Sequence, residues 1–479
     1  MLAAAGLCTV EVCATSYRGH SLLQREKKPV TEVKGSAGSD ECDSIAIGTL
    51  SASESSSTVL VLGNPNPVTD GEWEVTLRTI PVSQGDRTRS PALVHHVVQR
   101  VSTPMPEALL PTAKPTTTST KAPQAERVYF LPATIQPTPG STAHVAVPCS
   151  LATVNARTLI YIDQRIRRDE ALMGLVAAID SASTSTMIET VERLVGTVAD
   201  LDHDGHLTIV ITSEVGRLGQ QNNPVYGITR PSDFIRGVDR PHGNNSDVIF
   251  LSSSLPVSKQ LHAVLCHEWC HAAVFSRRFE NSGNAVEDRY DEDWLNEAIA
   301  HVVEVASSGS DSNVANRIQK YCARPGNSPL VIRDYCLPEY WRNDGVRGAG
   351  YLFLDWYLKR SDDNGLQHLL GTRSLDVASL EAIERQSFDE LFRSWTIGMG
   401  EQLAGEIREC EMNGAKSPRM THHRWKLVAG QEQTLILRIG GTCADFVRIE
   451  CSEDGAWQLI ATHSTRAPIQ ATLLPIDVQ

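Results

Sequence analysis

The sequence predicts an α+β protein, because strand-like and helix-like patterns occupy different parts of the 479-residue chain. Short β-branched runs such as "STVLVLG" and "RTLIYID" fill the first third, and similar runs return after about residue 415. Between them, apolar residues recur at three- and four-residue steps, as Ile188, Val191 and Val195 do. We therefore expect a mixed sheet followed by a helical lobe, with β-rich segments on both sides.

Changes in composition divide the chain into five expected segments. Residues 1–55 are predicted to be a disordered or leader segment, 56–102 a short β-rich segment, and 103–126 a Pro/Thr linker. Residues 127–410 are expected to form the main domain, beginning with β-strands, and 415–479 a C-terminal β-sandwich.

Each element is justified by its own pattern. Short β-branched runs bounded by turn residues predict strands at 57–63, 72–80, 92–101, 127–133, 142–149, 157–163, 206–213, 246–253, 424–430, 433–441, 445–452 and 456–463. Helical periodicity or sustained apolar content predicts helices at 168–201, 261–276, 291–306, 348–360 and 387–399. Ser258 is the expected N-cap of the second helix, and Gly309 follows the end of the third.

Composition argues against two classes of function. The formal net charge of −13 disfavours a nucleic-acid partner, because such proteins usually carry a basic patch or stripe. The sequence has no apolar run of about 18 residues, so we expect no integral membrane segment. The opening "MLAAAGLCTVEVCATS" lacks the basic region of a complete secretory signal, so it is either the tail of such a signal or a disordered terminus. We expect a secreted or cell-envelope protein.

The eleven cysteines leave two interpretations open. Cys322 with Cys336, and Cys443 with Cys451, bracket short loops, and either pair could form a disulfide in an oxidising compartment. Alternatively, these residues are free buried thiols.

The stretch "LHAVLCHEWCHAAVFS" (261–276) carries the clearest chemical signal. His267 and His271 are four residues apart, so a helix presents both on one face, where they can bind one zinc ion. Glu268 lies about 100° around the helix and can reach a water on the metal as a general base. The alternative is a pair of ordinary core histidines, and a third ligand would argue against it.

Glu297 is the expected third ligand. It lies in "DEDWLNEAIAH" on a separate predicted helix, and two histidines with one glutamate leave a fourth zinc position open for water. The Gly and His that a metzincin has after the second ligand histidine are absent. The neighbouring acids are better interpreted as charges in the connection or first helical turn: Glu287, Asp291, Glu292 and Asp293.

With these motifs, "HEWCH" followed by "WLNEAIAH", the chain resembles the gluzincin metallopeptidases, and most closely the hyicolysin-like neutral metallopeptidases. "ADLDHDGHLTIVIT", "SDVIFLS" and "RGAGYLFLDWYL" are similar to further stretches of that family, so the resemblance spans about residues 157–405. It implies a gluzincin-type peptidase fold, zinc as cofactor and a protein or peptide substrate. It also implies His267, His271 and Glu297 as zinc ligands, Glu268 as base and then acid, and Asn296 beside the metal ligands.

The chain departs from that family at two positions. Ala298 follows the ligand glutamate where relatives commonly have Gly, and Arg347-Gly348 stands where they often show Tyr-Gly. The oxyanion-stabilising role is therefore open, with Arg347 and Tyr351 as candidates. Tyr351 could equally be a buried aromatic residue. His301 could support a ligand or simply fill the core.

"DLDHDG" places Asp200, Asp202, Asp204 and Gly205 as at the start of an EF-hand calcium loop. The twelfth position is Ile211 rather than Glu, so the bidentate ligand is missing. A tight polar turn is the simpler interpretation, and calcium binding requires a carboxylate from another loop.

The expected function is a zinc endopeptidase, with the strand near 247–253 pairing with an extended substrate. One alternative is an aminopeptidase, although the sequence has no "GAMEN"-type motif. Another is a non-catalytic envelope or adhesion protein with a degenerate peptidase domain. The intact trio His267, Glu268 and His271 argues against degeneracy, whereas Ala298 and Arg347 keep this alternative open.

Overall fold

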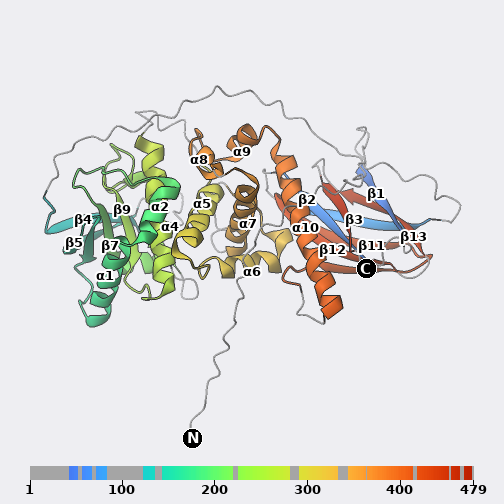
Figure 1. The fold of residues 1–479 in the computed structure, drawn as a ribbon, viewed down its shortest axis with the longest axis horizontal. Helices are drawn as coiled ribbons and strands as arrows, with labels where there is room; N and C mark the ends of the chain where they lie inside the picture. Colours follow the sequence, from blue (N-terminus) through green and yellow to red (C-terminus); the bar gives the residue numbers. More distant parts are fainter. Residues whose placement is uncertain are drawn as a thin grey trace, which may run out of the picture.

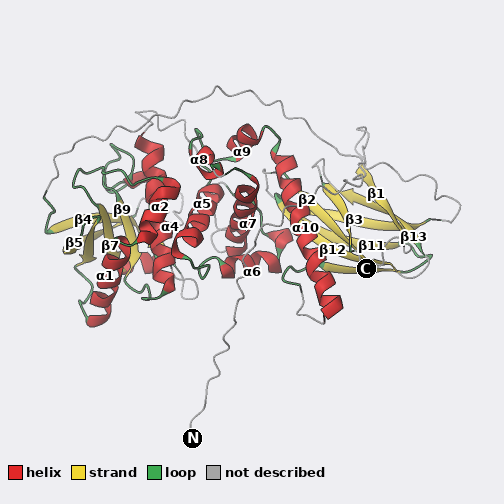
Figure 2. Ribbon diagram, viewed as in Figure 1, coloured by secondary structure: helices red, strands yellow, loops and turns green. Residues whose placement is uncertain are grey.

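The computed structural model describes residues 43–51, 57–66, 72–82, 122–134, 143–219, 225–280, 291–332, 343–362, 364–413, 418–451, 455–463 and 469–476. Within these residues the protein is α+β, with three sheets and ten α-helices (Figures 1 and 2). The strand expected at 92–101, Glu287 and Cys336 lie outside the described residues.

A six-stranded sheet forms one end of the molecule, in the order β4-β5-β6-β7-β9-β8 (Figure 1). The parallel strands β6, β7 and β9 lie next to one another, whereas β4, β5 and β8 pair antiparallel with their neighbours. The parallel strands are buried along their whole length and are mostly apolar, because both of their faces are covered. The strands are β4 (Glu126–Pro132), β5 (His144–Val154), β6 (Thr158–Asp163), β7 (Leu207–Thr212), β8 (Gly227–Ile228) and β9 (Val248–Ser252).

Helices cover one face of this sheet. Ile160, Ile209 and Ile249 share a hydrophobic core with α1, α2 and α4, while Tyr129 and Phe250 belong to a smaller cluster on the opposite face. Helix α5 packs against α4, and α7 packs against both α5 and α6 (Figure 1). The helices are α1 (Glu170–Ser183), α2 (Thr186–Val195), α3 (Ser213–Leu218), α4 (Lys259–Glu280), α5 (Asp293–Ser308), α6 (Ala315–Ala323), α7 (Asp344–Arg360), α8 (Gly365–Leu370), α9 (Val377–Glu384) and α10 (Phe388–Asn413).

Two four-stranded sheets form the other end of the molecule, in the orders β1-β13-β3-β11 and β10-β12-β2-β14 (Figure 2). A hydrophobic core that includes Leu60, Leu77, Val447 and Trp457 joins them. The strands are β1 (Asp43–Ser51), β2 (Ser57–Asn64), β3 (Glu72–Pro81), β10 (His423–Leu427), β11 (Gln433–Gly440), β12 (Cys443–Cys451), β13 (Ala456–His463) and β14 (Gln470–Pro475).

This arrangement differs from the expected separation of an N-terminal β-rich segment from a C-terminal sandwich. Strand β2 lies between β12 and β14, and β3 lies between β13 and β11, so each sheet combines strands from both parts of the chain. Residues 43–51, expected within the leader segment, form β1 and pair with β13. Helix α10 packs against β2 and β14 and so connects these sheets to the helical lobe.

Several expected elements change length. The helix expected over 168–201 is two helices, because the chain turns between Ser183 and Thr186. Helix α10 continues to Asn413 instead of ending near residue 399, and α7 begins at Asp344, where the Asn343 side chain accepts a hydrogen bond from the Gly345 amide. Seven elements were not expected from the sequence: β1, β8, β14, α3, α6, α8 and α9.

The described residues contain no single helix that is long and apolar enough to cross a membrane, although the bent pair α1 and α2 together meets the length and composition test.

Candidate metal centre

The three residues predicted as ligands come together between α4 and α5. His267 and His271 lie one turn apart on α4, with their Nε2 atoms 3.1 Å from each other. Glu297 on α5 faces both: its Oε2 lies 3.4 Å from His267 Nε2 and its Oε1 3.7 Å from His271 Nε2. The ligand atoms all lie within 4.8 Å of one another, so this group could hold a metal ion.

The spacing of these three groups fits a tetrahedral centre. Nitrogen and oxygen ligands lie about 2.0–2.1 Å from zinc, so two of them at the tetrahedral angle stand about 3.3 Å apart. The two nitrogens are 3.1 Å apart, and the nitrogen–oxygen separations of 3.4 and 3.7 Å, which run to different oxygens of Glu297, are also close to that value. Two imidazoles and one carboxylate also match a known catalytic zinc donor set.

Each ligand histidine has a partner on its other ring nitrogen. His271 Nδ1 lies 3.3 Å from Asn296 Oδ1, which places Asn296 beside the site as expected. His267 Nδ1 lies 3.1 Å from Glu304 Oε2. An Nδ1–H that donates to these oxygens leaves the Nε2 lone pair directed toward the metal position.

Glu304 is a component that the sequence analysis missed. Its Oε2 also lies 3.0 Å from His301 Nδ1 and accepts a 3.0 Å hydrogen bond from Asn313 Nδ2. The Glu304 side chain is fully buried. Burial alone would raise the pKa of Glu304, but hydrogen bonds from His267 and His301 lower it to about 2. A sequence signal did exist, because Glu304 follows Glu297 by two helical turns within an apolar run.

His301 therefore packs behind the ligands and takes part in the Glu304 network. Its ring lies 4.6 Å from that of His267, centroid to centroid, and it is fully buried. His267, His301 and Glu304 form a second group whose atoms lie close enough to hold a metal ion. Glu304 Oε2 already lies within hydrogen-bond distance of three side-chain nitrogens, so a hydrogen-bonding role is favoured over metal binding for this group.

Glu268 lies next to the first ligand and is almost completely buried, with 6% of its surface exposed. Burial raises the pKa of Glu268 to about 7, and the charge of His267 and a hydrogen bond from Thr229 oppose this rise. A carboxyl group with a pKa near neutrality suits an acid–base role, because it can both accept and release a proton. Thr229, which contacts it at 2.8 Å, was not predicted from the sequence.

Arg347, rather than Tyr351, reaches the candidate metal ligands. Arg347 Nη1 lies 3.2 Å from Glu297 Oε2, at ion-pair distance, although that oxygen has no hydrogen bond within the described residues. Tyr351 makes no such contact with Glu268 or the three candidate ligands in the described part of the chain. Burial and then the neighbouring carboxylate of Asp355 raise the pKa of Tyr351 to about 12.

The rival acids near α5 serve local structure. Asp291 Oδ1 pairs with Arg278 Nη2 at 3.1 Å. Glu292 Oε2 accepts a 2.8 Å hydrogen bond from Trp294 Nε1. Asp293 begins α5 in its first turn, as expected.

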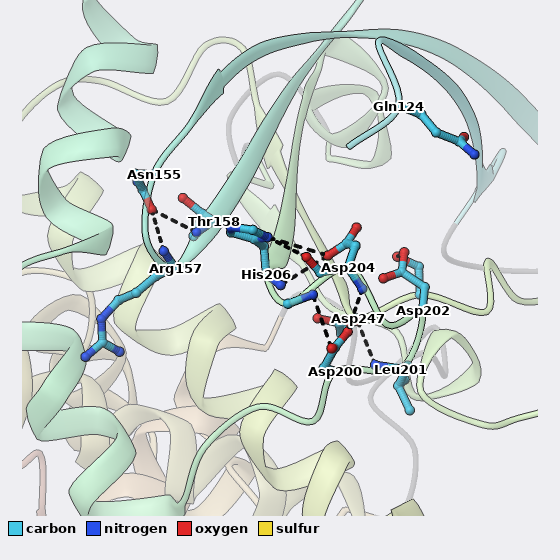
Figure 3. A network of polar contacts seen from close by, with 12 residues as sticks. Gln124, Asn155, Arg157, Thr158, Asp200, Leu201, Asp202, Asp204, His206 and Asp247 are labelled. Atoms are coloured by element: carbon cyan, nitrogen blue, oxygen red, sulfur yellow. Dashed lines mark hydrogen bonds and ion pairs between the residues drawn. The ribbon is translucent and has the colours of Figure 1, made fainter. Parts of the chain in front are cut away.

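The acidic turn before β7 holds a different group of carboxylates from the one predicted (Figure 3). Asp200 and Asp202 belong to a possible metal-binding group, but its third member is Asp247, just before β9, rather than Asp204. Asp204 instead pairs with Arg127 Nη2 at 3.2 Å, and Arg127 Nη1 also contacts Asp202 at 2.8 Å.

Two of these carboxyl groups are strongly perturbed. Burial first, and then the neighbouring Asp202 charge, raise the pKa of Asp204 to about 6 and that of Asp247 well above its ordinary value. Asp247 Oδ1 accepts a 3.0 Å hydrogen bond from the Leu201 amide, which ties the turn to β9.

The proposed disulfide between Cys443 and Cys451 is not formed. Both thiols are free and stand at opposite ends of β12, which spans Cys443–Cys451. An extended strand places its ends too far apart for a disulfide, because the two Cα atoms of a disulfide are usually about 4.4–6.8 Å apart. Cys322 is also free, and its suggested partner lies outside the described residues.

Neither the known protein-family models nor the curated protein sequences match this chain.

Proposed function

We propose that this protein is a zinc-dependent metallopeptidase, with His267, His271 and Glu297 as ligands and Glu268 as general base. The observation that carries the proposal is the convergence of the two imidazole nitrogens and the Glu297 carboxylate at separations of 3.1 to 3.7 Å, with a buried glutamate adjacent to the first ligand. The resemblance to gluzincin metallopeptidases supports the same assignment through the same residues.

A zinc ion in this site would lower the pKa of a bound water and polarise a peptide carbonyl. Glu268 takes a proton from the attacking water and passes it to the leaving amine. Arg347 is the candidate to stabilise negative charge on the carbonyl oxygen, because its guanidinium lies beside ligand Glu297. Tyr351 is not favoured for this role, since Arg347 supplies the contact.

The sequence suggested that an extended substrate pairs with β9, but Phe250 and Leu251 of that strand already have strand partners on both sides. Strand β7 lies on one side of β9, and β8 pairs with Phe250 and Leu251 on the other. The outer edge of the sheet next to the site belongs to β8. An extended peptide is therefore proposed to pair with β8, where its backbone would pass near Glu268.

Calcium is proposed as a second ion, at Asp200, Asp202 and Asp247. Oxygen-only carboxylate groups suit calcium, and Asp247 supplies the carboxylate from another loop that the acidic turn lacks. Arg127 already balances part of the negative charge at Asp202, so any calcium site here has to accommodate that cation.

Metal analysis combined with casein digestion tests the main proposal. We expect about one zinc per chain, and we expect Glu268→Gln to retain zinc but lose hydrolysis, because the ligands remain while the base is removed. Absence of zinc from the wild-type protein contradicts the proposal, and full activity of Glu268→Gln contradicts the assignment of the base.

The same assay separates the alternatives. Cleavage of peptides with blocked N-termini supports an endopeptidase, whereas cleavage restricted to free N-termini supports an aminopeptidase. Zinc binding without any hydrolysis favours the non-catalytic envelope or adhesion protein. The secreted or cell-envelope location stays a prediction.

A further inference from the structure

The short strand β8 lies directly against Glu268. Gly227 pairs with Leu251 on β9, and a Cβ atom added to Gly227 would stand 2.6 Å from both Cγ and Oε1 of Glu268. Atoms at this distance overlap, so any side chain at position 227 must displace the carboxylate. The requirement for glycine here is one of space.

Thr229 holds the same carboxylate from the end of β8. Its hydroxyl lies 2.8 Å from Glu268 Oε2, to which it donates, and 3.2 Å from the Glu268 backbone oxygen. Thr229 is buried, with 9% of its surface exposed. One carboxylate oxygen is thus engaged by the hydroxyl, which leaves Oε1 to exchange protons.

A buried network fixes the chain that carries Thr229. Arg230 Nε donates to Asp233 Oδ2 at 2.9 Å, and Asn244 Nδ2 donates to Asp233 Oδ1 at 2.9 Å. Asn244 Nδ2 also donates to the backbone oxygen of Phe130 on β4, at 3.1 Å. Because Arg230, Asp233 and Asn244 are all buried, the segment after β8 is held rigidly against the sheet.

We propose that Gly227 and Thr229 are positioning residues that fix the orientation of the Glu268 carboxylate for proton transfer. Thr229 holds Oε2 by a hydrogen bond, and the bare Gly227 backbone limits how far the side chain can swing. The proposal depends on the function proposed above, because it assigns these residues to the base of that reaction. Within the described residues, neither has a hydrogen bond or ion pair to the three candidate metal ligands, so substituting them should affect catalysis without affecting metal binding.

Steady-state kinetics on the zinc-loaded full chain test the role of Thr229. We expect Thr229→Val to lower kcat by roughly 10- to 100-fold, the range that corresponds to losing a hydrogen bond to a charged group. KM and zinc affinity should stay within about twofold, and Thr229→Ser should restore most of kcat because it returns the hydroxyl. Thr472→Val is the matched control, since Thr472 is similarly buried (7% exposed) in the distant strand β14.

A parallel pair tests Gly227. We expect Gly227→Ala to lower kcat by at least tenfold with zinc retained, because the clash falls on side-chain atoms of Glu268. Gly174→Ala is its control, since a Cβ there meets nothing within 4 Å. Wild-type kcat in both Thr229→Val and Gly227→Ala would overturn the inference, as would an equal loss in Thr229→Ser.

Crystal structures of the zinc-loaded Thr229→Val and Gly227→Ala variants supply a measurement that does not depend on activity. We expect the Glu268 carboxylate to rotate or shift in both variants. An unmoved carboxylate overturns the inference even when the wild-type protein proves inactive. Absence of hydrolysis by the wild type contradicts the proposed function instead, so the two failures are distinguishable.

Discussion

Replacing Glu304 with Gln should weaken both the fold and the metal site, although Glu304 is not itself among the three proposed ligands. The substitution preserves size and removes the negative charge that faces His267, His301 and Asn313. A hydrogen bond to a charged group contributes about 1.5–3 kcal/mol, and one to a neutral group about 0.5–1.5 kcal/mol. The expected loss is therefore about 1 kcal/mol per bond, or about 3 kcal/mol for the three bonds.

The same change should reduce metal affinity. Glu304 orients His267 and keeps the proton on Nδ1, so a neutral amide leaves the ligand less basic and less firmly held. Loss of such a partner typically costs roughly 10- to 100-fold in metal affinity. Chelator competition measures the change in metal affinity, and urea unfolding of the metal-free protein measures the change in the free energy of unfolding.

The pH dependence of the stability difference gives a further check. The pKa of Glu304 is lowered to about 2 in the folded protein, from an ordinary value near 4.5. A lowered pKa stabilises the fold at pH values above the ordinary one, so the wild-type advantage should shrink as pH falls from 4.5 toward 2. Glu189→Gln is the control, because the Glu189 side chain is 58% exposed.

Two results would refute this reasoning. Equal zinc affinity in the wild type and Glu304→Gln would show that Glu304 does not support His267. Equal unfolding free energies at neutral pH would show that the three contacts contribute no net stability.

Three further predictions concern other parts of the chain. Gly400→Ala should destabilise the protein by about 1–3 kcal/mol in urea unfolding, because its Cβ would stand 2.4 Å from a Val61 methyl. Gly405→Ala is the control and should not destabilise the protein, because a Cβ there has no neighbour within 4 Å. Equal stabilities of the two variants would argue against the packing of α10 on β2. Calcium should raise Tm in the wild type but not in Asp247→Asn, and an unchanged wild-type Tm excludes the calcium site. Burial alone would raise the pKa of Asp163, but hydrogen bonds from neighbouring groups lower it. The stability of the wild type relative to Asp163→Asn should therefore decline as pH falls below about 3.8. Parallel curves of stability against pH for the two proteins would contradict this assignment.

The sequence predicts most of the candidate metal centre because the spacing of its residues is local. His267 and His271 share a helix face by their four-residue separation, and Glu297 follows in a recognisable helical pattern. Gly227 and Thr229 carried no such signal, since a strand of two residues is too short to show any periodicity. Glu304 was visible as an acid in an apolar run, but its partners on other turns and helices appear only in the folded protein.

The helix and strand types were largely predictable, whereas strand pairing and some helix ends were not. Strand β1 pairs with β13, which lies some 400 residues later, and no local pattern records such a contact. Helix α10 was expected to end near residue 399 but continues through Gly400, although glycine disfavours a helix interior. Glycine fits at this position because the sheet packs so closely that a larger residue would collide with Val61 and Leu474.

The pairing of β1–β3 with strands from the C-terminal part of the chain has a consequence for biosynthesis. About 350 residues separate the end of β3 at Pro81 from the start of its neighbour β11 at Gln433. At about 5–20 residues per second, a ribosome needs roughly 20–70 s to cover that distance. During this interval β2 and β3, whose core-facing side chains are apolar, have emerged without their sheet partners, while the segments that form the candidate metal centre are being completed. The nascent chain must therefore keep two aggregation-prone strands from pairing wrongly until its last strands arrive.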